Sequence, residues 1–177
     1  MILVPIGRFP GDVLEELAFR AGIRLAPVCI DPLPAWNSER GQYSSARLIE
    51  ILKSQFDEPV VGAADEDLYL PVLTFVFGEA EMPGRAAVFS IHRLREEFYG
   101  LPANRHRLID RAYREFRHEW GHLSGLAHCR DSGCVMASSH SVELVDSKTA
   151  DFCRFCSTKF EAVFQARPHQ QNGWGMA

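Results

Sequence analysis

The side chains best placed to do chemistry fall in one short stretch, which has the pattern H-E-x-x-H-x-x-G-x-x-H from His118 to His128. His118 and His122 stand four residues apart, so on a helix they project from one face and can reach a single metal ion. Gly125 can take the left-handed conformation that ends a helix, which lets the chain turn back and bring His128 to the same ion. Three protein ligands leave a fourth position for water, as in a catalytic rather than a structural zinc site.

Glu119 follows the first histidine and is not needed as a ligand. We expect it to act as the general base that takes a proton from the water at the metal and delivers it to the leaving group. A single histidine is more often an ordinary surface or core residue, but the complete spacing favours a metal site.

A second group of metal-binding side chains begins directly after His128. Cys129 and Cys134 form C-x4-C, and Cys153 and Cys156 form C-x2-C. Such pairs, separated by a loop, are typical of a closed zinc site with four cysteine ligands. Adjacent residues of an extended segment point in opposite directions, so His128 and Cys129 are expected to serve two different ions. The alternative is four ordinary thiols, with a redox pair at Cys153 and Cys156.

Length and composition limit the class of protein. A chain of 177 residues with 46% hydrophobic and 24% charged residues suits one globular domain, or a domain with a small subdomain. The net charge of -4 gives no support for binding nucleic acid or an anionic membrane. The apolar start, Met1 to Ile6, is too short for a signal peptide, and no run approaches the roughly 20 residues of a membrane span. We therefore expect a cytoplasmic protein, where cysteines are better explained as metal ligands than as disulfides.

The first third of the chain alternates between strand and helix patterns. Strands are expected at Ile2–Ile6, Ile23–Ile30 and Pro59–Gly62, with helices after Asp12 and after Ser44 or Ser45 as caps. This order predicts parallel strands joined by right-handed crossovers.

Two segments in this part are open to a functional interpretation. Cys29 lies in an expected strand and is interpreted as a buried thiol rather than a functional one. Residues 31–43 hold two prolines, Trp36 and Gly41, and form an expected loop of about a dozen residues, long enough to line or cover a site.

The centre of the chain predicts an antiparallel hairpin made of Leu73–Phe77 and Ala86–Ile91. One of these strands would be the antiparallel edge of the sheet, where an extended peptide can add by main-chain hydrogen bonds, and we expect the edge near Leu73–Phe77 to align such a peptide. The preceding Asp65–Asp67 lacks the glycine and distal glutamate of a calcium loop, so we expect a solvated turn.

The longest helical pattern runs from Pro102 to about Ser124. Its apolar stripe leaves the histidines on a different face, and consists of Ile109, Tyr113, Phe116, Trp120 and Leu123. Several arginines make its first half basic, but acidic residues are interspersed, so nucleic acid is not the expected partner. A closing helix is expected within 146–166, and the residues from Arg167 on are expected to be loosely ordered.

The combined pattern H-E-x-x-H-x-x-G-x-x-H-C-x4-C-x-M…C-x2-C resembles the archaemetzincins, a family of metzincin zinc peptidases. The resemblance implies that His118, His122 and His128 bind a catalytic zinc ion, that Glu119 is the general base and that Met136 is the methionine of the turn beneath that ion. It also implies that the four cysteines bind a structural zinc. Trp120 departs from the pattern, because the family more often has a smaller aliphatic residue there.

With this resemblance, the expected fold is α+β and metzincin-like. It would have a mixed, mostly parallel five-stranded sheet with an antiparallel edge strand, an active-site helix and a small zinc-stapled C-terminal subdomain. Within one catalytic domain, 1–177, we expect an N-terminal subdomain at 1–125, a C-terminal subdomain at 126–166 and a flexible tail at 167–177.

The leading functional hypothesis is a zinc metallopeptidase with two Zn²⁺ per chain, acting as a monomer on a peptide or protein substrate, with neither nucleic acid nor membrane as a partner. The alternative is a zinc-binding adaptor or peptide-binding protein whose peptidase-like site is latent or occluded. A nucleic-acid contact by the four-cysteine unit is a third, weaker hypothesis.

Overall fold

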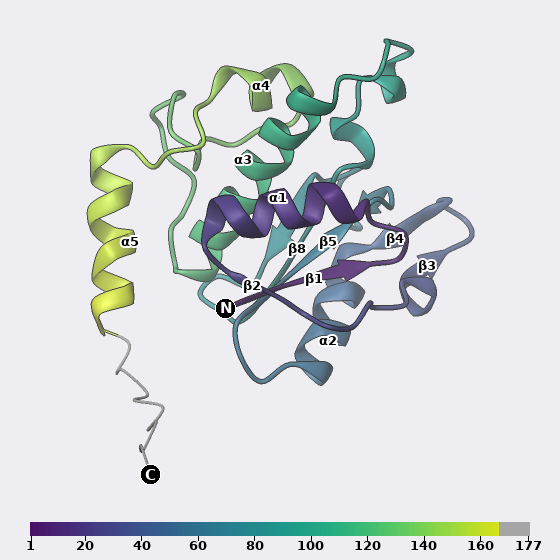
Figure 1. Cartoon of the computed structure of the whole chain (residues 1–177), viewed down its shortest axis with the longest axis horizontal. Helices are drawn as coiled ribbons and strands as arrows, with labels where there is room; N and C mark the ends of the chain where they lie inside the picture. Colours follow the sequence, from purple (N-terminus) through teal and green to yellow (C-terminus); the bar gives the residue numbers. More distant parts are fainter. Residues whose placement is uncertain (167–177) are drawn as a thin grey trace.

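The apolar run at Ile2–Ile6 forms β1, an inner strand of a five-stranded sheet in the computed structural model, which describes residues 1–166 (Figure 1). The strand order is β2-β1-β5-β8-β7. The other four strands are β2 (Arg24–Leu25), β5 (Val60–Ala64), β8 (Ala86–Ser90) and β7 (Gly78–Ala80). All pair in parallel except β7, which is antiparallel to β8. The predicted mixed sheet with an antiparallel edge strand is therefore confirmed.

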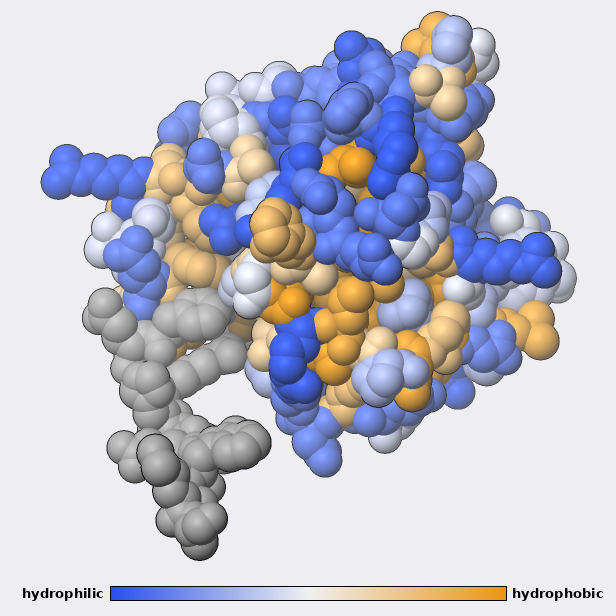
Figure 2. All heavy atoms as spheres, in the orientation of Figure 1, coloured by the Kyte–Doolittle hydropathy of each residue, from blue (hydrophilic) through white to orange (hydrophobic). Residues whose placement is uncertain are grey.

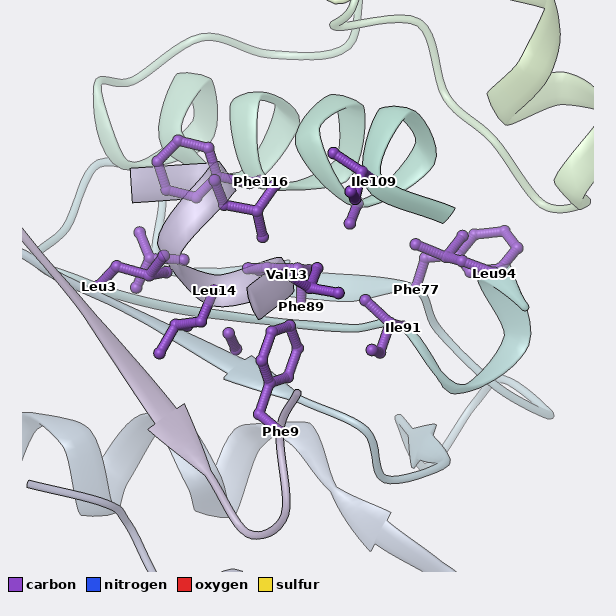
Figure 3. Packing of buried hydrophobic residues seen from close by; sticks show 14 of the residues in the cluster. Leu3, Phe9, Val13, Leu14, Phe77, Phe89, Ile91, Leu94, Ile109 and Phe116 are labelled. Atoms are coloured by element: carbon purple, nitrogen blue, oxygen red, sulfur yellow. The ribbon is translucent and has the colours of Figure 1, made fainter. Parts of the chain in front are cut away.

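Helices cover both faces of this sheet. α1 (Gly11–Ala21) and α3 (Arg105–Leu123) lie on one face and α2 (Ser45–Gln55) on the other (Figure 1). Because successive strand residues point to opposite faces, Leu3 packs in the cluster under α1 and α3 (Figure 3), whereas Val4 packs in the cluster under α2. Strands buried on both faces explain the uninterrupted apolar runs in the sequence.

Helix boundaries follow local capping chemistry. The Ser44 side chain accepts a hydrogen bond from the Arg47 N–H and caps α2, as the sequence predicts. Asn104 caps α3 in the same way through the Arg107 N–H. Asp12 is not the cap of α1, because that helix already begins at Gly11 and Asp12 lies in its first turn.

Shorter elements complete the fold. A small sheet has the order β3-β4-β6, formed by Trp36–Asn37, Gln42–Ser44 and Leu68–Tyr69. Single turns of 3-10 helix lie at Leu33–Ala35, His92–Leu94 and Glu97–Tyr99. The segment 31–43 is thus partly ordered into strands rather than being a plain loop.

The C-terminal part holds two helices, α4 (Val142–Ser147) and α5 (Arg154–Ala166), where the sequence predicts a single closing helix. α5 stands to one side of the sheet layers (Figure 1) and is joined to α3 through Trp120, whose ring lies 5.6 Å from Phe116 and 5.4 Å from Phe160. The predicted tail at 167–177 lies outside the described residues. Figure 2 shows one face of the molecule as mostly hydrophilic, with apolar residues gathered near its middle. Within residues 1–166, no helix combines the length and apolar character needed to cross a membrane.

The edge strand is not where the sequence places it. Leu73–Phe77 forms no strand, and β7 begins one residue later at Gly78. The reason is that side chains already bond to carbonyl groups which a strand would use to pair with its neighbour. Arg40 donates to the Leu73 carbonyl at 2.7 Å, and Gln42 donates to the Thr74 carbonyl at 2.9 Å.

Two smaller predictions are also corrected. Cys29 is exposed rather than buried, because the predicted strand at Ile23–Ile30 ends at Leu25 and the chain then runs along the surface. The acidic turn at Asp65–Asp67 is not simply solvated, since Asp67 pairs with Arg93 at 2.6 Å and Asp65 pairs with Arg95.

Candidate active site

The three histidines of the motif converge at the C-terminal end of α3. His118 and His122 lie on the helix, and the helix ends at Leu123. Gly125 then takes a φ of +84°, while the Leu126 N–H donates to the Gly121 carbonyl at 3.0 Å. This left-handed turn reverses the chain and brings His128 back, so that one nitrogen from each histidine lies within 4.8 Å of the others.

Hydrogen bonds orient two of these rings. His118 Nδ1 lies 2.8 Å from the Val135 carbonyl, and His122 Nδ1 lies 2.7 Å from the Leu126 carbonyl. These contacts place the Nδ1 protons on the carbonyl side and leave the Nε2 lone pairs facing each other at 3.0 Å. Tetrahedral zinc at its usual bond length would hold two nitrogens about 3.3 Å apart, so the donor set fits such an ion.

Burial acts on the protonation of all three rings in the same direction. It lowers the pKa of His118 well below its ordinary value, and it also lowers the pKa of His122 and His128. The neutral imidazole is the form that binds a metal, so the pocket favours the ligating state.

Glu119 lies beside this triad with almost no exposure to solvent. Only 3% of the residue is exposed, and its Oε2 has no hydrogen-bond partner among the described residues. Burial, followed by the nearby Glu115 carboxylate, raises the pKa of Glu119 well above its ordinary value. A dication held by the histidines would act in the opposite direction and favour the carboxylate.

Two glycines make room for the side chains around the triad. A Cβ at Gly78 on β7 would lie 2.8 Å from both Cγ and Cδ of Glu119, so the carboxylate packs directly on the edge-strand backbone. A Cβ at Gly121 would collide with the Met136 sulfur. Met136 is fully buried and packs against α3 at Gly121, the residue directly before His122.

The four predicted cysteines also come together. Their sulfur atoms all lie within 4.8 Å of one another, with Cys129 Sγ and Cys153 Sγ 3.8 Å apart. Four thiolates around tetrahedral zinc would be separated by about 3.8 Å, so this donor set fits as well. The Cys156 N–H is the main cause that lowers the pKa of Cys153 to about 7, whereas burial raises the pKa of Cys134 and Cys156.

The two donor sets share one segment of chain. Cys129 forms an isolated parallel bridge with Ala137, and its N–H donates to the Met136 carbonyl at 2.9 Å. The residue before Cys129 is a member of the histidine triad, and Met136 packs against Gly121 of the helix that carries the other two histidines. Backbone hydrogen bonds therefore tie the cysteine cluster to the turn that holds Met136, since the Ala137 N–H also donates to the Cys134 carbonyl at 2.9 Å.

A cleft of about 590 Å³ opens onto the triad. It lies between α3, the segment from Leu70 to Met82 and the segment from Ser138 to His140. No residue of 31–43 is among the described residues that line it, so the prediction that this segment could line the site is wrong.

The arginines of α3 are engaged within the protein. Arg107 pairs with Glu96 at 2.7 Å, and Arg111 pairs with Asp146 at 2.6 Å. These pairs account for much of the basic character of the helix without a nucleic-acid partner.

Sequence reasoning missed several residues at the cleft. Glu115 lines it and forms an ion pair of 3.1 Å with the buried Lys148. The spacing of four between Glu115 and Glu119 places them on one helix face, and this signal was present in the sequence. Gly78, Glu79 and Lys148 carry no local signal, because only the fold brings them to the site.

Comparison with known proteins agrees with this geometry. The sequence model of peptidase family M54 matches residues 35–162. Archaemetzincin from Methanocaldococcus jannaschii is 38% identical over 162 residues, covering 89% of this chain and 90% of that protein. The chain belongs to the archaemetzincins, peptidase family M54. The prediction of the family from the combined histidine and cysteine pattern is confirmed.

Solved structures of the archaemetzincin family share the fold. Archaemetzincin from Methanopyrus kandleri matches with a TM-score of 0.77 and 33% identity, covering 93% of this chain and 96% of that one. Archaemetzincin from Archaeoglobus fulgidus, complexed with malonate, has a TM-score of 0.77 and 32% identity over 89% and 98% of the two chains. A zinc-dependent peptidase from Methanocorpusculum labreanum has a TM-score of 0.76 and 29% identity over 90% and 100%. As an archaemetzincin, this protein is a zinc metallopeptidase.

Proposed function

We propose that His118, His122 and His128 bind the catalytic zinc ion and that Glu119 is the general base of peptide-bond hydrolysis. The observation that carries this proposal is a buried carboxylate, without a hydrogen-bond partner among residues 1–166, placed beside three converging imidazoles in an open cleft. Burying a carboxylate in this way is costly for stability, so a structural role does not account for it.

When bound, the metal polarises the scissile carbonyl and lowers the pKa of a water molecule. Glu119 accepts the proton of the attacking water and donates it to the leaving amine. Gly78 keeps the carboxylate close to the edge strand, and burial raises the pKa of Glu119, which favours its taking up a proton.

The substrate peptide is proposed to lie along β7. This strand is the last of the sheet, and its residues Gly78–Ala80 line the cleft. The free edge of a strand binds an extended chain through main-chain hydrogen bonds, which gives affinity without selecting a sequence. We therefore propose that β7, rather than the predicted strand at Leu73–Phe77, binds the substrate peptide.

The second proposed ion is a structural zinc bound by Cys129, Cys134, Cys153 and Cys156, giving two zinc ions per chain. Four thiolates close the coordination shell, so this centre holds the chain rather than activating water. We also propose that residues 1–125 form an N-terminal subdomain and residues 126–166 a C-terminal subdomain. The C-terminal subdomain forms one wall of the cleft.

The decisive experiment replaces Glu119 by Gln or Ala in zinc-loaded protein and profiles cleavage of an unbiased peptide library. The expected result is loss of turnover by at least about a hundredfold, with the zinc content unchanged because Glu119 is not a ligand. Turnover that survives at the parental rate would show that another group is the base.

The adaptor hypothesis makes a different prediction for the same library. Peptides would bind the cleft, and none would be cleaved by the parental protein. Segment 31–43 does not line the cleft, so it gives no support for occlusion.

A further inference from the structure

The cleft continues beyond the triad to a carboxylate that the proposed reaction does not use. Glu115 lines the cleft and lies one helical turn before Glu119, yet only 3% of the residue is exposed. Lys148 holds the Glu115 carboxylate in place. Its ammonium group lies 3.1 Å from Glu115 Oε1 and donates to the Ala137 carbonyl at 3.3 Å. Lys148 is 2% exposed and is not part of the cleft wall, so the group presented to a ligand is the carboxylate.

Several polar atoms of residues that line the cleft lack hydrogen-bond partners among the described residues. Glu115 Oε1 takes part in the ion pair but accepts no hydrogen bond of good geometry among the described residues. Ser139 Oγ and Glu79 Oε2 line the same cleft and are also buried without a hydrogen-bond partner there. Buried polar groups are normally satisfied, so three unsatisfied acceptors on residues that line one cleft favour a ligand that brings hydrogen-bond donors.

The charge of the wall points in the same direction. Besides Glu119, the described residues that line the cleft include the carboxylates of Glu79 and Glu115, and they include neither lysine nor arginine. An acidic ligand group would meet repulsion here, while an ammonium or guanidinium group would make charge-assisted hydrogen bonds.

We propose that the end of the cleft formed by Glu115 and Ser139 is a specificity pocket for a cationic side chain, lysine or arginine, of a residue flanking the scissile bond. This inference rests on the proposed peptidase function and names the substrate class that the site selects.

The dimensions of the helix suit this assignment. Glu115 precedes Glu119 by four residues, so the two carboxylates are separated by about 6 Å along the helix axis. A substrate residue placed at Glu119 must bridge that length, and the four-carbon stem of lysine extends its ammonium group by about 6 Å. Shorter polar side chains fall short. Norleucine fills the space but leaves the acceptors unsatisfied, which a site built for hydrogen bonds penalises.

Lys148 does not compete with the proposed ligand. An ionised carboxylate has about four lone-pair positions, so Glu115 can accept from Lys148 and from a substrate at the same time. The ion pair with the buried ammonium also holds the Glu115 carboxylate in one orientation, which prepares the pocket before the substrate arrives.

The test compares peptides that differ only by lysine or norleucine at each position flanking the scissile bond. The parental protein is expected to prefer lysine by about tenfold in kcat/KM at one of these positions. The Ser139→Ala variant should reduce that ratio by about threefold. Removing Glu115 alone would leave Lys148 buried and unpaired, so the second variant is Glu115→Gln combined with Lys148→Met, which should abolish the preference.

A matched control removes an exposed ion pair elsewhere, through Arg47→Met combined with Glu50→Gln on α2. The lysine-to-norleucine ratio should be the same in this control as in the parental protein. Short peptide hydroxamates that carry either lysine or norleucine at the tested position bind without being cleaved. Their dissociation constants therefore measure the preference independently of turnover.

The outcomes separate the pocket from the peptidase function. Cleavage of both peptides with equal kcat/KM would overturn the pocket and leave the peptidase function intact. Preferential binding of the lysine hydroxamate, without cleavage of any peptide, would support the pocket and contradict the proposed turnover. A preference that persists in the double variant would assign the selectivity to other residues and overturn the inference.

Discussion

The substitution Gly78→Ala tests how closely the edge strand holds the proposed general base. The added methyl carbon would lie 2.8 Å from Cγ and Cδ of Glu119, whereas ordinary van der Waals contact begins near 3.4 Å. The methyl carbon would lie still closer to Oε1 of Glu119, so the carboxylate must move by more than about 0.6 Å, the difference between these two distances.

Catalytic geometry is sensitive on this scale, since a displacement of about 1 Å can lower a rate about a hundredfold. We expect Gly78→Ala to lower kcat/KM by about 30- to 100-fold, equivalent to about 2 to 2.7 kcal/mol of transition-state stabilisation. Overpacking would also lower the free energy of unfolding by about 1–3 kcal/mol. Peptide cleavage, zinc content and urea unfolding of the purified variant measure these three quantities.

Two further variants make the result specific. Gly11→Ala introduces the same methyl group at a helix start with no neighbouring atom within 4 Å, and it should leave kcat/KM and zinc content unchanged. In a Glu119→Asp background, where the carboxylate is one methylene shorter, Gly78→Ala should cost much less than in the parental protein. An equal loss in both backgrounds, or full activity in Gly78→Ala itself, would refute the idea that Gly78 acts through Glu119.

Two other predictions concern metal content and acid stability. The Cys134→Ser variant should lose the structural ion and fold poorly, whereas His122→Ala should lose only the catalytic ion. Elemental analysis of the purified proteins measures both losses. One zinc ion in the parental protein, retained by Cys134→Ser, would exclude the two-centre arrangement. Partial burial opposes ionisation of Asp146, but its hydrogen bonds with Arg111 outweigh this and lower the pKa of Asp146 below its ordinary value of 3.8. The ion pair therefore contributes stability above that value and loses it as the pH falls through the lower folded-state pKa, so Asp146→Asn should flatten the decline in unfolding free energy below about pH 4.

Most of the candidate site could be predicted from the sequence, because the spacing of residues along a helix determines which side chains share a face. Residues four apart share a helix face, so convergence of His118 and His122 needs no knowledge of the rest of the fold. The return of His128 could also be predicted, because Gly125 can take the required left-handed turn. The convergence of the four cysteines followed from the same kind of pattern.

Residues that reach the site through tertiary structure could not be predicted in this way. Lys148 is 33 positions beyond Glu115 in the numbering, and only the packing of the C-terminal segment against α3 pairs them. The edge strand was misplaced because Leu73–Phe77 has the better strand composition. Its carbonyl groups are taken by Arg40 and Gln42, two side chains from a distant segment whose positions no local pattern reveals. Local strand propensity is weak evidence for a strand where hydrogen bonds from distant side chains compete with the main-chain hydrogen bonds of the sheet.

α3 presents its apolar stripe to the sheet and its histidines to the cleft, so a change on one side of the helix is transmitted to the other. A helix with its side chains has a radius of about 5–6 Å, so a rotation of 10° about the axis moves the tips of its side chains by about 1 Å. A core substitution that rolls the helix, such as a change of volume at Phe116, would therefore shift the imidazole nitrogens by a substantial fraction of a metal–ligand bond length. The proposed metal site would thus set a limit on which core mutations are tolerated, from the opposite side of the same helix.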